Sequence, residues 1–332
     1  MGIKPNALGQ NRHRIHVSLP WARIIGPPPD LEGLTWSRRS VDWGLSRWRS
    51  RIQYVADGLR VLRLGGRDDT IILCHSGTDA VAAGLAHQIL FRSKRLIVVD
   101  FLLPPSLPRR LLRMALRGVD EFVVIRSGDA KILAGLGVPA DRCRFTAFAA
   151  PAPTPNKSLG VGEYVYSGGF AQRDWPTLAN ALGRAGIPAI VSCPDKEQKF
   201  TENVFRLGVV RPYEGRRFLS KCRFLVQAIL DNEQPSGPLL ILDAFSAGKP
   251  VVASDVNGTR DYVEHNVNGV LVPPGDPVAL AEATSALFDD VERLGRMGQA
   301  ARRTASVLSA DRFWREVLAP YVSPYGKQGL VK

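Results

Sequence analysis

Two runs of alternating strand and helix patterns, one in each half of the chain, constrain the fold most strongly. Short segments rich in Val and Ile alternate with longer segments whose apolar residues recur at helical spacing. This alternation predicts parallel strands joined by crossover helices. The expected strands of the first half are Arg14–Leu19, Leu59–Leu64, Thr70–His75, Arg95–Asp100, Glu121–Ile125 and Arg142–Thr146, and the expected helices are Asp79–Arg92, Pro108–Arg117 and Asp129–Leu136.

A proline-rich segment separates the two halves. Pro151, Pro153 and Pro155 stand at alternate positions, which excludes a helix interior or a central strand and predicts a stiff linker. The alternation then restarts. The expected strands are Tyr164–Ser167, Ala189–Cys193, Phe224–Ala228, Val251–Ser254 and Val270–Val272, and the expected helices are Trp175–Ala185, Arg216–Lys221, Leu239–Ala247 and Val278–Phe288.

This pattern predicts an α/β protein with two doubly wound, Rossmann-like sheets that face each other. In such sheets ligands bind beyond the carboxyl ends of the strands, so we expect the site in the cleft between two domains. The expected divisions are a first domain (1–150), a linker (151–158), a second domain (159–310) and a C-terminal helix and tail (311–332).

The composition is that of a globular protein, with 45% hydrophobic and 23% charged residues. No apolar run approaches the roughly 20 residues that span a bilayer, and the N-terminal segment lacks the apolar core of a signal peptide. We therefore expect a cytoplasmic protein. The four cysteines are scattered, which favours small buried core residues over disulfides or a metal site.

The first segment that carries chemistry follows the expected strand Tyr164–Ser167. Gly168 and Gly169 lead into a short loop with Arg173, and then into a helix. Glycines let backbone amides approach an anion, the helix start adds partial positive charge, and an arginine binds a diphosphate in a two-pronged contact. The alternative, a tight turn without a ligand, stays open on this segment alone.

The second segment joins a polar loop to an apolar helix. The helix starts after Ser236 and Gly237, and its first turn exposes free amides. Asp243 lies one to two turns further, among residues that are nearly all apolar. Because a carboxylate there is costly unless it is paired or faces a polar cleft, the position favours a functional role over that of a surface charge.

These segments carry a resemblance to a known family. The runs SGGFAQRDW (167–175) and SGPLLILDAFSAGKPVVASDVNGTRDYVEHNVNGVLVPPGDPVALA (236–281) resemble the donor domain of family 4 glycosyltransferases, also called glycosyl transferases group 1. The resemblance spans about Tyr164–Ala281. It implies a GT-B fold with an acceptor-binding first domain, a nucleotide-sugar-binding second domain and a C-terminal helix that packs back on the first domain.

The resemblance also implies the donor-binding residues. Arg173 stands where the family has the cation that neutralises the diphosphate, and Asp243 matches the family's second glutamate, which binds the ribose. The first glutamate would stand at Pro235 and is absent. Glu233, two residues out of register, is its expected substitute. The remaining expected donor-binding residues are Gly168, Gly169, Ser236, Gly237, Leu239 and Lys249.

In the first half, two residues at the carboxyl ends of expected strands are the catalytic candidates. His75 resembles the family's strand-terminal histidine and is expected to hold donor or acceptor hydroxyls, although a position near a helix start without chemistry remains open. Asp100 stands where the family often has another histidine. It is expected to orient an acceptor hydroxyl or accept its proton.

The resemblance implies transfer of a sugar from a UDP- or GDP-sugar with retention of configuration, without a cofactor or a metal ion. The acceptor hydroxyl attacks on the face that the diphosphate leaves, so positioning and electrostatics supply the catalysis. Two alternatives stay open: a nucleotide-sugar epimerase, and a non-catalytic nucleotide-sugar-binding or scaffold protein. The missing glutamate at Pro235 and the aspartate at position 100 favour the scaffold.

The net charge of +13 points to an anionic partner. Arg109, Arg113 and Arg117 are four residues apart and share one face of an expected helix, which suits an anionic membrane surface or an ordinary solvent-exposed face. Tryptophans beside arginines near residues 21–51 suit lipid head groups, base stacking or plain packing. We expect a lipid-linked or other anionic glycan acceptor, as in cell-surface polysaccharide or glycoconjugate synthesis, and no nucleic acid, because no binding module is recognisable.

Overall fold

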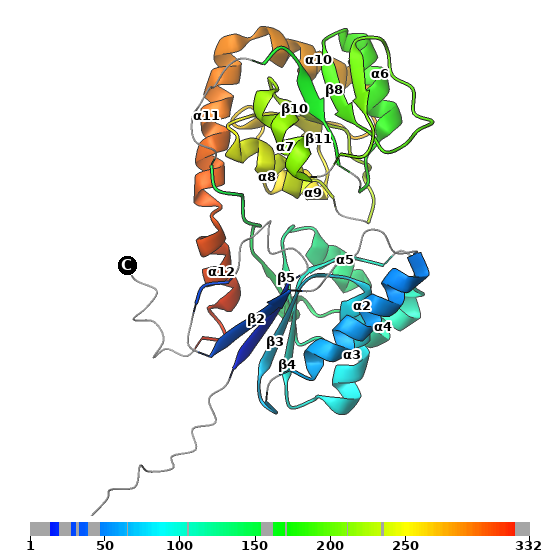
Figure 1. Ribbon diagram of the computed structural model, residues 1–332, viewed down its shortest axis with the longest axis vertical. Coiled ribbons are helices and arrows are strands. Elements are labelled where there is room, and N and C mark those ends of the chain that lie inside the picture. The colour runs from blue at the N-terminus through cyan, green and yellow to red at the C-terminus, as the bar shows by residue number, and fades with distance from the viewer. Residues whose placement is uncertain are drawn as a thin grey trace, which may run out of the picture.

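Two parallel sheets form the frame of the protein (Figure 1). The computed structural model describes residues 14–19, 28–30, 33–38, 47–64, 66–104, 106–153, 162–169, 171–210, 212–233 and 236–322. Within these residues each sheet has six strands, and all neighbouring strands pair in parallel. The predicted α/β class with two doubly wound sheets is confirmed.

The first sheet has the strand order β2-β1-β3-β4-β5-β6. Its central strands are continuous apolar runs because both faces of the sheet are covered. The order reverses between β1 and β3, which makes their carboxyl ends a topological switch point. The strands are β1 (Ile15–Leu19), β2 (Leu34–Arg38), β3 (Thr70–Ser76), β4 (Arg95–Phe101), β5 (Glu121–Val124) and β6 (Cys143–Phe145).

Helices α2 (Arg47–Leu62), α3 (Thr78–Leu90), α4 (Arg109–Leu116) and α5 (Asp129–Gly135) cover one face of this sheet, and a short 3₁₀ turn (Ala140–Arg142) precedes β6. The strand predicted at Leu59–Leu64 is wrong, because most of this segment is the last turn of α2. Helix α2 approaches α3 closely at Gly58. A Cβ atom there would lie 2.3 Å from the backbone oxygen of Asp79 in α3.

The second sheet has the order β12-β11-β10-β7-β8-β9, with its switch point between β7 and β10. Helices α6 and α10 lie on one face, and α7 and α8 on the other. The strands are β7 (Val165–Ser167), β8 (Ala189–Ser192), β9 (Val204–Leu207), β10 (Leu225–Gln227), β11 (Val251–Ser254) and β12 (Gly269–Val272), and the helices are α6 (Trp175–Ala185), α7 (Pro212–Lys221), α8 (Pro238–Ser246), α9 (Asn257–Arg260) and α10 (Pro277–Asp289).

Two C-terminal helices connect the sheets. Helix α11 (Val291–Val307) packs on α8, and α12 (Ala310–Leu318) lies against the first sheet, as Figure 1 shows in orange and red. Phe313 and Trp314 of α12 are fully buried in the apolar cluster that includes β1. The expectation that the C-terminal helix packs back on the first domain is confirmed. The predicted domain boundaries stay a prediction, because residues 154–161 of the linker region lie outside the described residues.

Candidate functional site

The loops that follow β7 and β10 are joined at the switch point of the second sheet. An antiparallel bridge pairs Arg173 with Ile229. On either side of it the backbone nitrogen of Asp174 donates to Ala228 O at 3.1 Å, and that of Leu230 donates to Gln172 O at 3.0 Å. Because ligands bind where the strand order reverses, these contacts fix the backbone of Arg173 at the expected place for a ligand.

The Arg173 guanidinium is held by neutral acceptors. Nε donates to Gly168 O and Nη1 to Ala171 O, each at 2.8 Å, and Nη1 also donates to Ser236 Oγ at 2.9 Å. No described carboxylate forms an ion pair with it, and burial lowers its pKa to about 10. A desolvated cation without a counter-charge is a site for an anion.

Gly169 contributes to the surroundings of Arg173 in a way that differs from the expectation. It has φ = +106°, and a Cβ atom there would lie 2.4 Å from Arg173 Nη2. The glycine therefore makes room for the guanidinium, whereas the sequence suggested room for an anion against backbone amides. Gly168 contributes its carbonyl oxygen to the same guanidinium.

The start of α8 lies beside Arg173. Gly237 is the N-cap residue, with φ = +115° and no capping side chain, and Pro238 opens the helix. The amides of the first turn, including that of Leu239, are therefore available to an anion. Ser236 is nearly buried, and its hydroxyl donates to Ala171 O at 2.6 Å while accepting from Arg173. The structure thus brings Arg173, Ser236, Gly237 and Leu239 together, with the Ser236 hydroxyl committed to protein partners.

Asp243 is paired. Its Oδ1 lies 2.9 Å from Nη2 of Arg216 in α7, and its side chain is 17% exposed. Burial raises the pKa of Asp243, and Arg216 opposes that rise. The ion pair with Arg216 offsets the cost of placing the Asp243 carboxylate among apolar residues. A bound ribose is therefore not needed to explain this carboxylate, and the ribose contact stays a prediction.

Lys249 does not join the other expected donor residues. It lies between the end of α8 and the start of β11, at the amino-terminal edge of the sheet, whereas Arg173 lies at the carboxyl edge. The residue is 5% exposed, and burial lowers its pKa. A cation near the end of α8 is too far from its start to contact a diphosphate bound there.

Glu233 forms an ion pair with a residue of the first half. Its carboxylate forms an ion pair with Arg109 at the start of α4, and both side chains are more than half exposed. Arg109, expected to face a membrane, and Glu233, expected to bind the donor, therefore link the two halves of the protein. Such exposed pairs stabilise by about 0–1 kcal/mol. Pro235, where the family's first glutamate would stand, lies outside the described residues.

The two catalytic candidates lie at the carboxyl ends of β3 and β4. The backbone of His75 belongs to β3, and its side chain lies outside the described part of the chain. Asp100 has φ = +56°, and its carboxylate is buried against Arg126, whose Nη2 donates to Asp100 Oδ1 at 2.7 Å. This pairing corrects the expectation of a proton acceptor open to the cleft: the carboxylate is committed to a buried ion pair.

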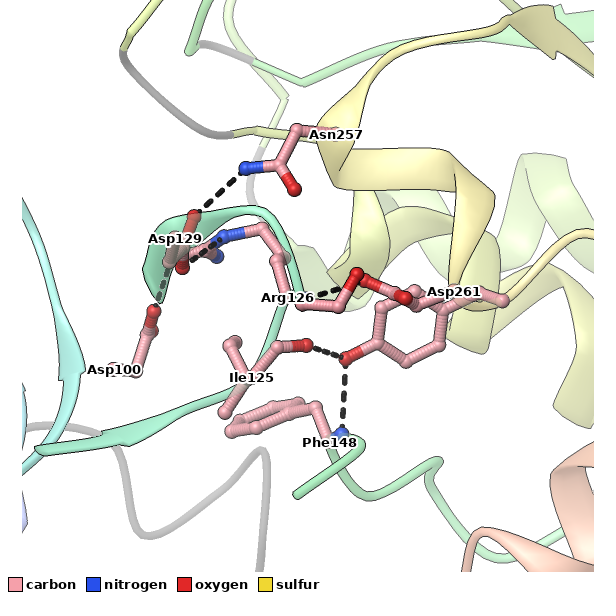
Figure 2. Close-up of polar contacts among 9 residues, drawn as sticks. Asp100, Ile125, Arg126, Asp129, Phe148, Asn257 and Asp261 are labelled. Atoms are coloured by element: carbon pink, nitrogen blue, oxygen red, sulfur yellow. Dashed lines mark hydrogen bonds and ion pairs between the residues drawn. The ribbon is translucent and has the colours of Figure 1, made fainter. Parts of the chain in front are cut away.

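Arg126 joins a larger polar cluster between the sheets (Figure 2). Its Nε donates to Asp129 Oδ2 at 2.8 Å, and Asn257 of α9 donates through Nδ2 to Asp129 Oδ1 at 2.8 Å. Nearby, the backbone nitrogen of Ser127 donates to Asp261 at 2.6 Å. We did not expect these residues from the sequence. The signal was that Arg126 and Asp129 follow β5 at the ligand-binding edge, where Asp100 also lies, one residue before the end of β4.

The Tyr262 hydroxyl completes the contact between the two halves. It donates to Ile125 O and accepts from the backbone nitrogen of Phe148 at 2.9 Å. The tyrosine is 3% exposed, and burial is the main cause that raises its pKa. Loop 125–129 and segment 257–262 therefore form a hydrogen-bonded interface between the two halves.

A second unexpected feature is a buried amide without partners. Gln227 ends β10 beside Ala253 of β11, its side chain is fully buried, and neither its Nε2 nor its Oε1 has a hydrogen-bond partner among the described residues. The Ser167 hydroxyl at the end of β7 is buried and without a partner as well. Unsatisfied buried groups are rare in native proteins and concentrate where water or a ligand binds, and both lie at the edge that carries Arg173.

Comparison with known sequences singles out the same half of the chain. Residues 185–290 match the family model described as glycosyl transferases group 1. Over 123 residues, 37% of this chain and 28% of the relative, the chain is 34% identical to a D-inositol 3-phosphate glycosyltransferase of Xylanimonas cellulosilytica. Over 90 residues, 26% of this chain and 10% of the relative, it is 40% identical to exopolysaccharide phosphotransferase SCO2592 of Streptomyces coelicolor. The matches thus span less than a third of either relative.

Among solved structures, the Anabaena protein Alr3699/HepE in complex with UDP-glucose has the same fold. The TM-score is 0.70 at 16% sequence identity, and the match covers 93% of this chain and 99% of that chain. The GT-B fold and the resemblance to group 1 glycosyltransferases, both expected from the sequence, are confirmed.

Proposed function

We propose that this protein is a retaining glycosyltransferase that moves a sugar from a UDP- or GDP-sugar to a hydroxyl acceptor. The observation that carries the proposal is the pairing of Arg173 with the uncapped start of α8 at the switch point of the second sheet. A desolvated guanidinium and free helix amides form a site for a diphosphate. The UDP-glucose complex of the structurally similar HepE supports a nucleotide-sugar donor.

In the proposed reaction, Arg173 and the α8 amides stabilise the negative charge that develops on the leaving diphosphate. The acceptor hydroxyl attacks the anomeric carbon from the face that the diphosphate leaves, and its proton moves to the departing phosphate. The step needs no metal ion, because the cation and the amides neutralise the charge. Asp243 would reach a ribose beside Arg216, and His75 at the end of β3 would hold hydroxyl groups of the sugar.

A screen of nucleotide sugars tests the proposal directly. We expect a UDP- or GDP-sugar to raise the melting temperature, because a ligand that binds only the folded state stabilises it by about 2.7 kcal/mol at 100 times its Kd. Transfer is then measured with the stabilising donor and cell-envelope glycans as acceptors. Binding without transfer would favour a scaffold, and conversion of the donor sugar without an acceptor would favour an epimerase. A screen in which no nucleotide sugar binds would contradict the proposal.

A basic and apolar surface on the first sheet supports an anionic membrane as a partner. Ile89 and Leu90 at the end of α3 are 79% and 70% exposed, beside a depression of ≈ 580 Å³ that Arg63, Arg67 and Arg92 also line. Exposed apolar residues ringed by cations suit lipid head groups. It lies at the amino-terminal edge of the first sheet, opposite the edge that carries Asp100. On the expected surface of α4, Arg109 is paired with Glu233, and the membrane contact of Arg113 and Arg117 stays a prediction. No helix among the described residues is long and apolar enough to cross a membrane.

Flotation with lipid vesicles tests this partner. We expect the protein to float with vesicles that contain phosphatidylglycerol at low salt and not with phosphatidylcholine alone. The double variant Ile89→Glu/Leu90→Glu is expected to lower the partition coefficient at least about tenfold, because it replaces apolar contact with like charge toward the lipid. Phe205→Glu, an exposed apolar residue of the second sheet (66%), is the matched control. Equal flotation of the double variant and the control would remove this surface from the proposal.

A further inference from the structure

A continuous series of contacts runs from the first sheet to the candidate diphosphate site. It begins with Arg126, whose side chain is 3% exposed and lies between the buried carboxylates of Asp100 and Asp129. Asp129 uses Oδ2 for Arg126 and keeps Oδ1 for Asn257. The strands and the ion pairs hold the Asp129 carboxylate in one orientation, so it presents a fixed acceptor to α9 of the second half (Figure 2).

Two glycines beside Asn257, Gly128 of the first half and Gly258 of α9, lie too close to their neighbours to carry a side chain. A Cβ atom on Gly128 would lie 2.2 Å from Asn257 Oδ1, and a Cβ atom on Gly258 would lie 1.5 Å from the backbone oxygen of Ser236. Loop 126–129, helix α9 and loop 236–237 are therefore in direct contact, in that order. A shift of α9 relative to the first sheet must move the loop that holds Ser236.

The last contact reaches the guanidinium. Ser236 Oγ accepts from Arg173 Nη1 at 2.9 Å. We propose that Asn257 is a positioning residue: its hydrogen bond to Asp129 sets where the Ser236–Arg173 site stands relative to the first sheet, and hence where the donor stands relative to the acceptor. The catalytic part of this inference rests on the proposed transfer reaction, and the structural part does not.

The variant Asn257→Ala separates positioning from binding. Every group proposed to hold the diphosphate belongs to the second half, so we expect its Kd for UDP to stay within about twofold of the wild type. We expect kcat for transfer to fall about 10- to 100-fold, because a misplacement near 1 Å costs about that much. The amides of residues 125–129 are expected to exchange hydrogen faster, since the variant loosens their contact with α9.

Asn203→Ala is the matched control. The Asn203 amide donates to Leu182 O and Ile187 O and accepts from Thr201 Oγ1, all within the second half, so its loss removes three hydrogen bonds without touching the first sheet. We expect a lower melting temperature with kcat and exchange at 125–129 unchanged. The inference is overturned if Asn257→Ala leaves exchange at 125–129 as in the wild type, or if it leaves kcat unchanged. If the wild type binds and transfers no nucleotide sugar, the proposed function fails, and the exchange measurement alone decides whether Asn257 links the halves.

Discussion

Replacing Arg173 with alanine is expected to weaken the binding of the sugar-nucleotide donor at least about 100-fold, because one or two charge-assisted hydrogen bonds to the diphosphate are lost. Lysine at this position keeps the charge but cannot reproduce the three bonds that orient the guanidinium, to Gly168 O, Ala171 O and Ser236 Oγ, so Arg173→Lys is expected to bind with intermediate affinity. Calorimetric titration with the donor found in the screen measures both.

The fold is expected to survive this change. Arg173 bonds to two carbonyl oxygens and the Ser236 hydroxyl, and no described carboxylate is left unpaired when it is removed. Arg206→Ala is the matched control, because Arg206 also donates to backbone oxygens, at the far edge of the same sheet. An Arg173→Ala variant that binds the donor like Arg206→Ala would remove the diphosphate from this site.

Replacing Arg126 with methionine is expected to lower the free energy of unfolding by about 3–5 kcal/mol, the usual effect of removing one partner from a buried ion pair. The side chains of Asp100 and Asp129, 3% and 8% exposed, would be left as buried carboxylates without a cation. Urea denaturation measures the loss. The triple variant Arg126→Met/Asp100→Asn/Asp129→Asn is expected to recover most of it, because no buried charge remains.

The effect of Arg126→Met should depend on pH. Burial already raises the pKa of Asp129, and Arg126 opposes that rise. Without Arg126 the pKa of Asp129 in the folded protein rises further above its value in the unfolded chain. The folded variant then binds more protons than the unfolded chain, so the loss of unfolding free energy relative to the wild type becomes smaller as the pH falls. A deficit that stays constant between pH 7 and pH 5 would show that the two carboxylates are not its cause.

Elements with local start and stop signals could be predicted from the sequence. Helix α6 begins where Asp174 caps it and ends at Gly186 with φ = +64°, so its bounds were predicted as the structure has them. Helix α2 was not predicted, because a glycine such as Gly58 weakens a helix pattern. Its presence there is explained by the close contact with α3, which comes from a later segment of the chain. Strands β2 and β9 and helix α9 were missed, since they are short segments of four or five residues. Helix α11 was missed although Asp290 caps its start.

The same distinction applies to the candidate site. Arg173, Ser236 and the start of α8 could be predicted because turns and helix ends that bind anions are local motifs. The partners of the charged residues could not, because they come from distant segments. Asn257 and Asp129 are 128 positions apart, and Arg109 and Glu233 are 124 apart. Sequence reasoning places an acid or a base at the edge of a sheet, but it does not say which opposite charge the fold brings to it.

Helix α12 has a consequence for how the chain is made. Arg144 beside the first sheet donates to the backbone oxygens of Glu316 and Val317, and the first of these pairs is 172 residues apart. A ribosome that adds about 5–20 residues per second needs roughly 10–30 s to cover that distance. Throughout this time the face of the first sheet that α12 covers lacks that helix. Its apolar residues, Ile15 and Val17 among them, are then open to chaperones and to neighbouring nascent chains.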